Sequence, residues 1–444
     1  MDLKIKKGLD LPLSGAVTDS VVRQVPAARV AVIPDDFPGF VPKVDVKEGE
    51  TVQAGQPLMH HKQEPAVRLV SPVSGTVTAV VRGERRKVLR VEVEVSGNAA
   101  PLRFATESLT DASAVAMALA ESGLLAMMRQ RPYDIVPSPH VLPRDIFVTA
   151  FDSAPLAHNV ATGADKVAPL AAAVKLLGRL TKGKIYISRR DSGNCPDIPG
   201  AEMVNVSGPH PAGLVGVQIA NIRPVNKGET VWTMNLDTLC KVGTFATTGV
   251  VDHTALVAVT GSEVGHPYLA QTTVGACLDA LLSGQLKTGR GKNVRIISGN
   301  VLTGVKESMS GYLHYPYSQV TVIPEGDDVD EFMGWASLSP KKMSVSPSYP
   351  GHWFRKLFSP DARTLGGRRA MIMSGEYDRY IPMDIMAEYL LKAINSGNID
   401  AMERLGIYEV APEDFALAEY ADSSKQPLQE IVRRGLDGLR KEME

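Results

Sequence analysis

Cysteine is scarce in this chain of 444 residues. Cys195, Cys240 and Cys277 are the only three, and they lie far apart without a Cys-x-x-Cys pair. Iron–sulfur clusters, zinc ribbons and disulfide frameworks need cysteines at short, recurring spacings. We therefore expect none of these groups in the chain, and we expect it to work in a reducing compartment.

Long apolar runs are missing as well. A helix that spans a bilayer needs about 20 mostly apolar residues, and charge, proline or glycine interrupts every run here before that length. The charged start of the chain, residues 1–8, has no apolar region behind it and does not read as a signal peptide. The sequence predicts a soluble or peripheral protein without a transmembrane segment.

Neither sign of charge is in excess. The 48 Lys and Arg residues balance 49 Asp and Glu residues, so the net charge is −1. A chain without a basic surplus has no general positive field to attract nucleic acid, and we expect no nucleic-acid partner. The most basic short run, residues 82–87, is predicted to be a solvated hairpin turn.

Signatures of a metal site or a catalytic nucleophile are absent too. The nine histidines show no short metal-ligand spacing, and no Gly-x-Ser-x-Gly elbow occurs, so we expect no metal and no catalytic residue. The loop 207–216 follows a predicted strand and contains three glycines. Its spacing fits neither the dinucleotide fingerprint nor a P-loop, and two prolines remove N–H donors. A packing loop is favoured there over a dinucleotide site.

A carrier-like module is present at residues 44–95. Its halves, 46–58 and 71–80, read like the two flattened sheets of a lipoyl or biotinyl carrier domain. Such domains carry their cofactor on a lysine in the hairpin between the halves. Here Pro65 stands near that position and Lys62 is out of register. We predict a barrel-sandwich hybrid β module over 27–100 without its cofactor arm; a modified Lys62 is a weaker alternative.

The remaining chain divides by pattern into further parts. Residues 101–254 alternate helix and strand, which is typical of a parallel, Rossmann-like α/β layer. Helices are predicted at 114–128 and 165–180, and strands at 145–151, 184–188 and 201–206. Prolines between 132 and 143 predict an extended, exposed connection. Residues 1–26 are treated as a separate N-terminal segment.

After residue 254 the predicted pattern of helices and strands changes. Residues 255–328 look like a mixed α+β domain of the β-grasp (SLBB-like) kind. Strands are predicted at 256–260, 294–297 and 320–323, and a compact helix at 273–282. Residues 329–444 are loop-rich and then helical, with an amphipathic helix at 383–394. The fold class is therefore multidomain α/β and α+β.

Two loops combine aromatic rings, prolines and carboxylates. The first contains Ile33, Pro34, Asp35, Asp36, Phe37 and Phe40, and the second centres on Tyr133. Such loops can form the bottom of a binding site for a flat, apolar ligand. The alternative, which the residues alone favour, is that Phe37, Phe40 and Tyr133 plug the joint between the carrier-like module and the α/β domain.

These pieces, in this order, resemble the A subunit of the sodium-translocating NADH:quinone reductase along nearly the whole chain. The matching motifs are 5–15, 71–75, 147–156, 206–213, 297–304 and 334–336. The family is similar to two flavin-handling relatives, the C subunit of the Rnf complex and the flavin subunit of respiratory complex I. Their glycine-rich flavin loop would follow Gly123, where this chain has bulky side chains, and their cysteine motifs are missing here.

The resemblance implies a function within a larger assembly. It implies a peripheral subunit on the cytoplasmic face of the bacterial inner membrane, in a six-subunit complex that oxidises NADH, reduces ubiquinone or another quinone, and pumps Na⁺. It implies docking on the membrane-spanning B subunit, with a share in the quinone site through the two loops above. NADH, flavins and iron–sulfur centres would lie in partner subunits. The alternative is a flavin- or NADH-binding electron-input subunit like the C subunit of the Rnf complex.

Overall fold

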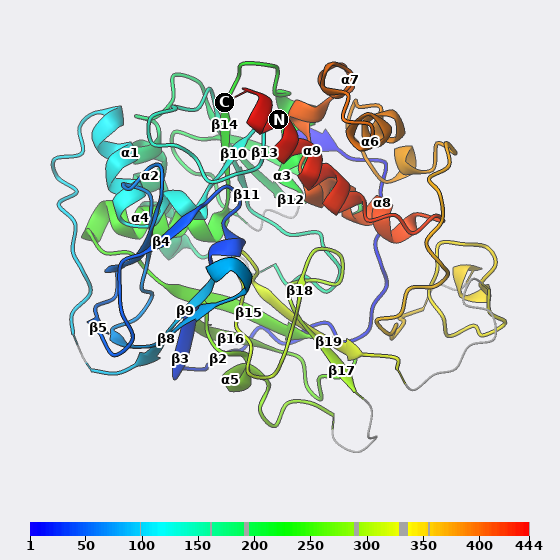
Figure 1. Cartoon of the computed structure of the whole chain (residues 1–444), viewed down its shortest axis with the longest axis horizontal. Helices are drawn as coiled ribbons and strands as arrows, with labels where there is room; N and C mark the ends of the chain where they lie inside the picture. The colour runs from blue at the N-terminus through cyan, green and yellow to red at the C-terminus, as the bar shows by residue number, and fades with distance from the viewer. Residues whose placement is uncertain are drawn as a thin grey trace.

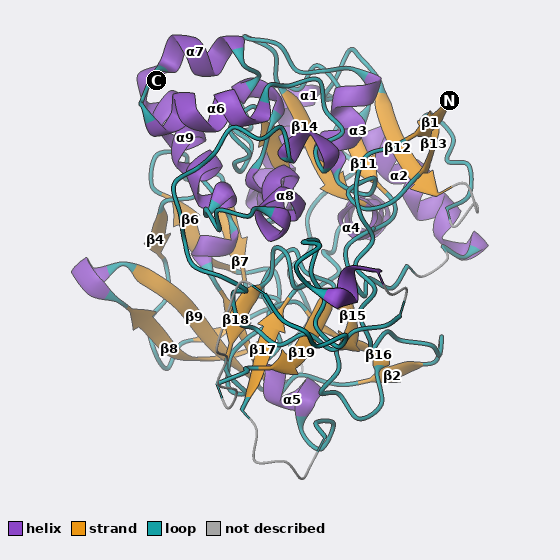
Figure 2. Cartoon of the chain, turned by 90° about the vertical axis from the view of Figure 1, so that its right-hand side faces the viewer, coloured by secondary structure: helices purple, strands orange, loops and turns teal. Residues whose placement is uncertain are grey.

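The computed structural model describes residues 1–97, 99–159, 162–190, 195–287, 293–327, 336–353 and 356–443. Within these residues the strands form four sheets, and most helices lie in the upper half of the molecule as drawn (Figures 1 and 2). Among the described residues, no helix is long and apolar enough to cross a membrane. Gly334 and Trp335 of the motif at 334–336 lie outside the described residues.

The carrier-like module consists of two facing sheets. One is the antiparallel sheet β3 (Arg29–Val32), β9 (Val88–Val95), β8 (Gly75–Arg82) and β5 (Thr51–Val52). The other is β4 (Pro42–Val44), β6 (Pro57–His61) and β7 (Arg68–Val70). Alternate residues such as Val77, Val91 and Val93 are fully buried, as expected of strands with one face in a core. The barrel-sandwich prediction is confirmed, and the basic run joins β8 to β9 as predicted.

The α/β domain is built on a mostly parallel sheet. Its strands, in spatial order, are β1 (Asp2–Lys4), β13 (Glu202–Ser207), β12 (Ile185–Arg190), β11 (Ile146–Thr149), β14 (Val231–Asn235) and β10 (Arg129–Arg131). Its helices are α1 (Ala112–Glu121), α2 (Val167–Leu177), α3 (Val215–Ile222) and α4 (Leu236–Thr248). Counted from β11, the central order is 3-2-1-4, which is the Rossmann order. The Rossmann-like prediction is confirmed.

A β-grasp-like sheet and a set of helices complete the fold. The sheet order is β18 (Val305–Glu307), β17 (Val294–Ser298), β19 (Gln319–Pro324), β15 (Thr254–Thr260), β16 (Tyr268–Thr273) and β2 (Val22–Gln24), with α5 (Leu278–Leu282) beside it. The C-terminal helices are α6 (Ala387–Asn395), α7 (Ile399–Arg404), α8 (Ala416–Ala421) and α9 (Leu428–Met443). These helices share a core with α3 and the α/β sheet.

Two predicted helices are shorter than expected, one at its end and the other at its start, and a glycine limits each. The helix predicted to reach residue 128 ends at Glu121, since Gly123 takes a left-handed φ of 81°. The helix predicted at 273–282 covers only 278–282, because Thr273 belongs to β16 and Gly275 packs against β3. A side chain at Gly275 would come within 2.2 Å of the Ala31 carbonyl oxygen.

The proline-rich connection also differs from the prediction. Pro132, Pro137, Pro139 and Pro143 are buried, and the connection is exposed only at residues 140–142. The chain reverses at Tyr133 and Asp134, which take left-handed φ angles of 79° and 52°. Other parts of the chain contact this connection: the Val136 N–H donates to the Pro38 carbonyl at 2.8 Å, and Arg433 donates to the Asp134 carbonyl at 3.1 Å.

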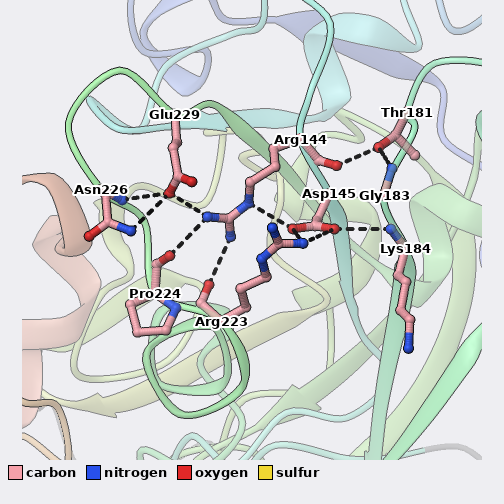
Figure 3. Close-up of polar contacts among 9 residues, drawn as sticks. All are labelled: Arg144, Asp145, Thr181, Gly183, Lys184, Arg223, Pro224, Asn226 and Glu229. Atoms are coloured by element: carbon pink, nitrogen blue, oxygen red, sulfur yellow. Dashed lines mark hydrogen bonds and ion pairs between the residues drawn. The ribbon is translucent and has the colours of Figure 1, made fainter.

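A buried carboxylate holds the amino ends of the parallel strands together. Asp145, just before β11, is fully buried and accepts hydrogen bonds from Arg144 at 2.7 Å and from the Lys184 backbone N–H at 2.9 Å. Arg223 pairs with it at 3.1 Å. Arg144 in turn donates to the Arg223 carbonyl at 3.0 Å and pairs with Glu229 (Figure 3). The network joins β11, the start of β12 and the loop before β14.

Asp145→Ala is therefore expected to lower the free energy of unfolding by about 2 kcal/mol, because it removes charged hydrogen bonds and leaves the Lys184 backbone N–H without its acceptor. Urea unfolding followed by circular dichroism measures the loss. Glu202→Gln is the control, since it breaks an exposed ion pair with Lys184 at 3.0 Å and should cost about 0–1 kcal/mol. Equal losses for both variants would contradict a stabilising role of the network.

Candidate functional site

The loop after β3 turns into the interior of the molecule. Pro34–Asp36 forms a short 3-10 turn with proline at its start. Ile33, Pro34, Phe37 and Phe40 are buried, whereas Asp35 is exposed and pairs with Lys87 at 2.6 Å. Most of the predicted site residues are thus inside the protein rather than on a free surface.

Phe37 lies where three parts of the chain meet. Its ring stacks on that of Tyr315, with centroids 5.4 Å apart and planes 6° from parallel. The guanidinium of Arg129 lies 6.0 Å from the Phe37 ring and 5.8 Å from the Tyr315 ring, within the range of cation–π attraction. Tyr315 also donates from its hydroxyl to the Met127 carbonyl at 2.6 Å. The carrier-like module, the α/β domain and the β-grasp part contact one another through these rings.

A small cavity of about 40 Å³ adjoins this contact. Most of its wall is apolar, and three predicted residues contribute to it: Ile33, Asp36 and Phe37. His253 also lines it, and its buried Nε2 has no hydrogen-bond partner within the described residues. Burial lowers the pKa of His253 to about 4, so its ring is neutral. The cavity has room for one or two water molecules.

Asp36 is the polar centre of the joint. Its Oδ1 lies 2.5 Å from His314 Nδ1, and its Oδ2 accepts the Tyr315 backbone N–H at 2.9 Å. On the other side of the imidazole, His314 Nε2 lies 2.9 Å from Glu307 Oε1. Both ring nitrogens thus face carboxylates, which can only accept when ionised. This geometry favours a charged imidazolium.

The pKa values of Asp36, His314 and Glu307 depend on burial and on the hydrogen bonds among the three side chains. Burial opposes the charge on His314, but hydrogen bonds to Asp36 and Glu307 outweigh it and raise the pKa of His314 to about 9. Burial raises the pKa of Asp36, against the pull of His314. Burial opposes the charge on Glu307, but its hydrogen bonds to His314 and to the Ser308 backbone, together with the nearby positive charges, outweigh burial and lower its pKa. A proton is therefore held firmly on His314, between loop 33–40 and the β-grasp part.

Phe40 and Tyr133 lie apart from the cavity. Phe40 packs edge-on against His61, with centroids 5.5 Å apart. Tyr133 packs against the C-terminal core, and its carbonyl accepts a hydrogen bond from Arg433. The structure thus joins Ile33, Asp36 and Phe37 in one place and does not bring Phe40 or Tyr133 to it.

A second charged cluster joins β10 to the C-terminal region. Arg131 is buried and donates to Asp414 at 3.0 Å and to Glu413 at 3.3 Å, both in a 3-10 turn at Pro412–Phe415. The Glu413 side chain is only partly buried, with 42% of it exposed; its partial desolvation and the neighbouring charge of Asp414 raise its pKa, opposed by Arg131. This cluster fixes the C-terminal helices on the α/β domain.

As predicted, the loop 207–216 packs against neighbouring residues and does not form an open dinucleotide site. His210 is buried, and its Nδ1 lies 3.0 Å from the Ser153 hydroxyl, which accepts the Gly213 N–H at 2.8 Å. At the start of α3, the Asp414 carboxylate lies so close to Gly216 that a side chain there would come within 2.4 Å of it. A negative charge already occupies this region beside the positive end of the helix. Among the described residues, no group of three or more His, Cys, Asp or Glu can hold a metal ion.

Several residues of these clusters carry no local sequence signal. His314 and Tyr315 lie 278 and 279 positions from Asp36, and His253 has no motif around it. Their role depends on long-range packing, which spacing rules do not reach.

Comparison with known proteins finds family models that match successive parts of the chain. Three family models match: an NqrA N-terminal barrel-sandwich hybrid domain over residues 3–96, an NqrA second alpha/beta domain over 110–251, and an NQRA C-terminal domain over 256–308. A solved NAD⁺-reducing NiFe hydrogenase is similar in part, with a TM-score of 0.33 and 17% identity, covering 49% of this chain and 47% of that one.

Curated relatives match nearly the whole chain. The A subunit of the Na⁺-translocating NADH-quinone reductase of Serratia proteamaculans is 36% identical over 451 residues, which cover 99% of this chain and 100% of the relative. Its counterpart in Pasteurella multocida is 35% identical over 449 residues, with the same coverage. The chain therefore belongs to the NqrA family, the A subunits of Na⁺-translocating NADH-quinone reductases.

Proposed function

We propose that this chain is a peripheral subunit of a Na⁺-translocating NADH:quinone reductase, on the cytoplasmic face of the bacterial inner membrane. It docks on the membrane-spanning B subunit, helps to form the quinone site and holds no redox cofactor itself. The observation that carries the quinone role is the cavity at the joint of three domains, where an apolar wall meets the unpartnered Nε2 of His253. Ligand sites are typically apolar clefts at domain joints with few polar groups.

The stack of Phe37 on Tyr315 suggests how a quinone ring would be received. The cavity itself is too small for a ring, so Phe37 must move off Tyr315 and the quinone ring takes its place in the stack. The neutral imidazole of His253 would then donate to, or be bridged by water to, a quinone carbonyl. Asp36 lines the same cavity and contacts the protonated His314. Phe40, Asp35 and Tyr133 would act on the site only through the surrounding loops.

Phe37→Leu in the assembled complex is the first test. Loss of the aromatic stack is expected to lower the quinone KM about two- to tenfold, because the quinone ring no longer has to displace Phe37 from Tyr315, and an aromatic pair contributes about 0.5–1.5 kcal/mol beyond its buried area. NADH oxidation by artificial acceptors should stay unchanged. Steady-state turnover with a short-chain ubiquinone measures the effect, and His253→Asn should raise the same KM.

The matched control is Phe104→Leu, which removes one ring of the Phe104–Phe245 pair, with centroids 5.6 Å apart. This pair is not among the residues that line the cavity. An unchanged KM in Phe37→Leu, or an equal change in Phe104→Leu, would mean that Phe37 only fills the joint between the domains.

The alternative of a flavin- or NADH-binding subunit has a separate test. Leu124 and Leu125, which follow Gly123, are fully buried, and the Asp414 carboxylate lies at the start of α3. Both arrangements leave little space for a flavin or a phosphate beside the backbone. The purified chain is expected to show no flavin absorption after denaturation. Flavin released in equimolar amount would overturn the cofactor-free proposal.

A further inference from the structure

One stretch of the C-terminal region is both basic and apolar. Its described residues, 336–353 and 356–373, carry six Lys or Arg side chains and one acidic residue, Asp361, in a chain whose net charge is −1. We call these residues the basic apolar segment. The exposed large apolar side chains in it are Leu338, Trp353, Leu357, Ile372 and Met373.

The exposure of these side chains is high. Leu338 is 95% exposed, Leu357 is 68% exposed and Trp353 is 65% exposed. Burying one such side chain contributes about 1.5–3 kcal/mol, so several left in water within one short stretch indicate a surface that is covered by something else. Figure 1 shows the stretch in yellow and orange along the right-hand edge of the molecule, beyond the sheets.

The backbone of the basic apolar segment is attached to the rest of the chain. Phe358 is buried, its N–H donates to the Pro12 carbonyl at 2.8 Å, and its carbonyl accepts the Ser14 N–H at 2.8 Å. Further along, the Arg369 N–H donates to the Ser424 carbonyl at 2.8 Å. These contacts hold the segment in place while its apolar side chains stay in solvent, so little ordering is needed before it binds a surface.

We propose that the basic apolar segment binds the anionic surface of a lipid bilayer. Tryptophan is enriched at the headgroup level of membranes, and Lys and Arg are attracted by anionic headgroups. A bilayer offers both partners at once, negative charge at its surface and an apolar layer directly beneath. The proposal rests on the proposed function, which places the chain at a membrane; the segment would add a direct lipid contact to the docking on a partner subunit.

The test uses the full purified chain and lipid vesicles. Vesicles of phosphatidylcholine with about one third phosphatidylglycerol are expected to bind the chain, and vesicles of phosphatidylcholine alone much less, because each basic residue adds about fivefold in affinity for an anionic surface. The triple variant Lys341→Gln, Arg368→Gln, Arg369→Gln should bind the anionic vesicles about 100-fold more weakly. Trp353→Ser with Leu357→Ser should also weaken binding at unchanged charge.

The matched control neutralises three exposed lysines elsewhere, through Lys6→Gln, Lys7→Gln and Lys43→Gln. It should retain most of the affinity, and circular dichroism should show all variants folded. Absence of binding by the unaltered chain, or equal losses in the segment and control variants, would overturn the proposal. Segment variants that bind vesicles normally but fail to assemble with membrane partners would show a protein interface instead. The vesicle assay does not measure quinone turnover. Failure of lipid binding can therefore be told apart from failure of the proposed quinone role.

Discussion

Arg131→Met is expected to lower the free energy of unfolding by about 3–5 kcal/mol. The Arg131 side chain is 1% exposed and pairs at 3.0 Å with Asp414, which is fully buried. Without the guanidinium, the Asp414 carboxyl group remains in the interior with no cation beside it, and an unpaired buried charge is strongly destabilising. Urea unfolding of the full chain measures the loss. Hydrogen exchange should be faster in α8 and α9, because the pair attaches them to β10.

A double variant tests the reason for this loss. Arg131→Met combined with Asp414→Asn removes both charges and should recover much of the stability, since replacing both members of a buried pair costs less than removing one. Lys227→Met is the matched control, because it breaks an exposed pair with Glu403 at 2.6 Å and should cost about 0–1 kcal/mol. A loss no larger in Arg131→Met than in Lys227→Met would contradict the structural role of the pair.

His314 is expected to make stability fall as the pH rises. Its pKa is raised from an ordinary 6.5 to about 9 in the folded protein, so the folded state binds the proton more tightly than the unfolded state. The stabilisation is complete below about pH 6.5 and is lost as the pH rises through 9, with an upper limit of about 3 kcal/mol. Unfolding curves between pH 6 and 9.5 measure the slope, which His314→Gln should reduce.

A second group titrates in an overlapping range, so the assignment needs its own variants. The raised pKa of Glu413, about 8 against an ordinary 4.5, also makes stability fall with pH, but over the window from 4.5 to 8. Glu413→Gln should flatten the lower part of the profile and His314→Gln the upper part. His266→Gln, at an exposed position, should leave the profile unchanged. A His314→Gln profile that matches the wild type would show that Asp36 and Glu307 do not hold the proton there.

The regular elements of the fold were largely predictable because their signals are local. Short apolar runs predicted β11, β12 and β13, and the repeated glycine and valine pattern of 46–80 predicted the carrier-like module. The sequence also shows where the glycines lie, but it does not show that they shorten the predicted helices. Gly123 ends its helix with a left-handed φ of 81° against the Val70 side chain, and Gly275 excludes a helix because it packs on the Ala31 backbone; Val70 and Ala31 come from other parts of the chain.

The site was only partly predictable. The composition of the loop 33–40 indicated a place where aromatic rings and carboxylates gather, and Ile33, Asp36 and Phe37 do line one cavity. Nothing in the local pattern separated them from Phe40, because burial on one face or another depends on what packs against the loop. Tyr133 was grouped with them by composition, yet it packs against the C-terminal core.

Residue order alone establishes the scarcity of cysteine, the balance of charge, the apolar runs of strand and helix length, and the motifs of one family. Those are properties of neighbours along the chain, and short-range periodicity is enough to read them. The partners of the buried charges depend on the folded arrangement instead. Asp36 meets His314 across 278 positions, Arg131 meets Asp414 across 283, and β1 and β2 join two different sheets. Such contacts form because long-range packing buries the charges together, and charges buried together must pair.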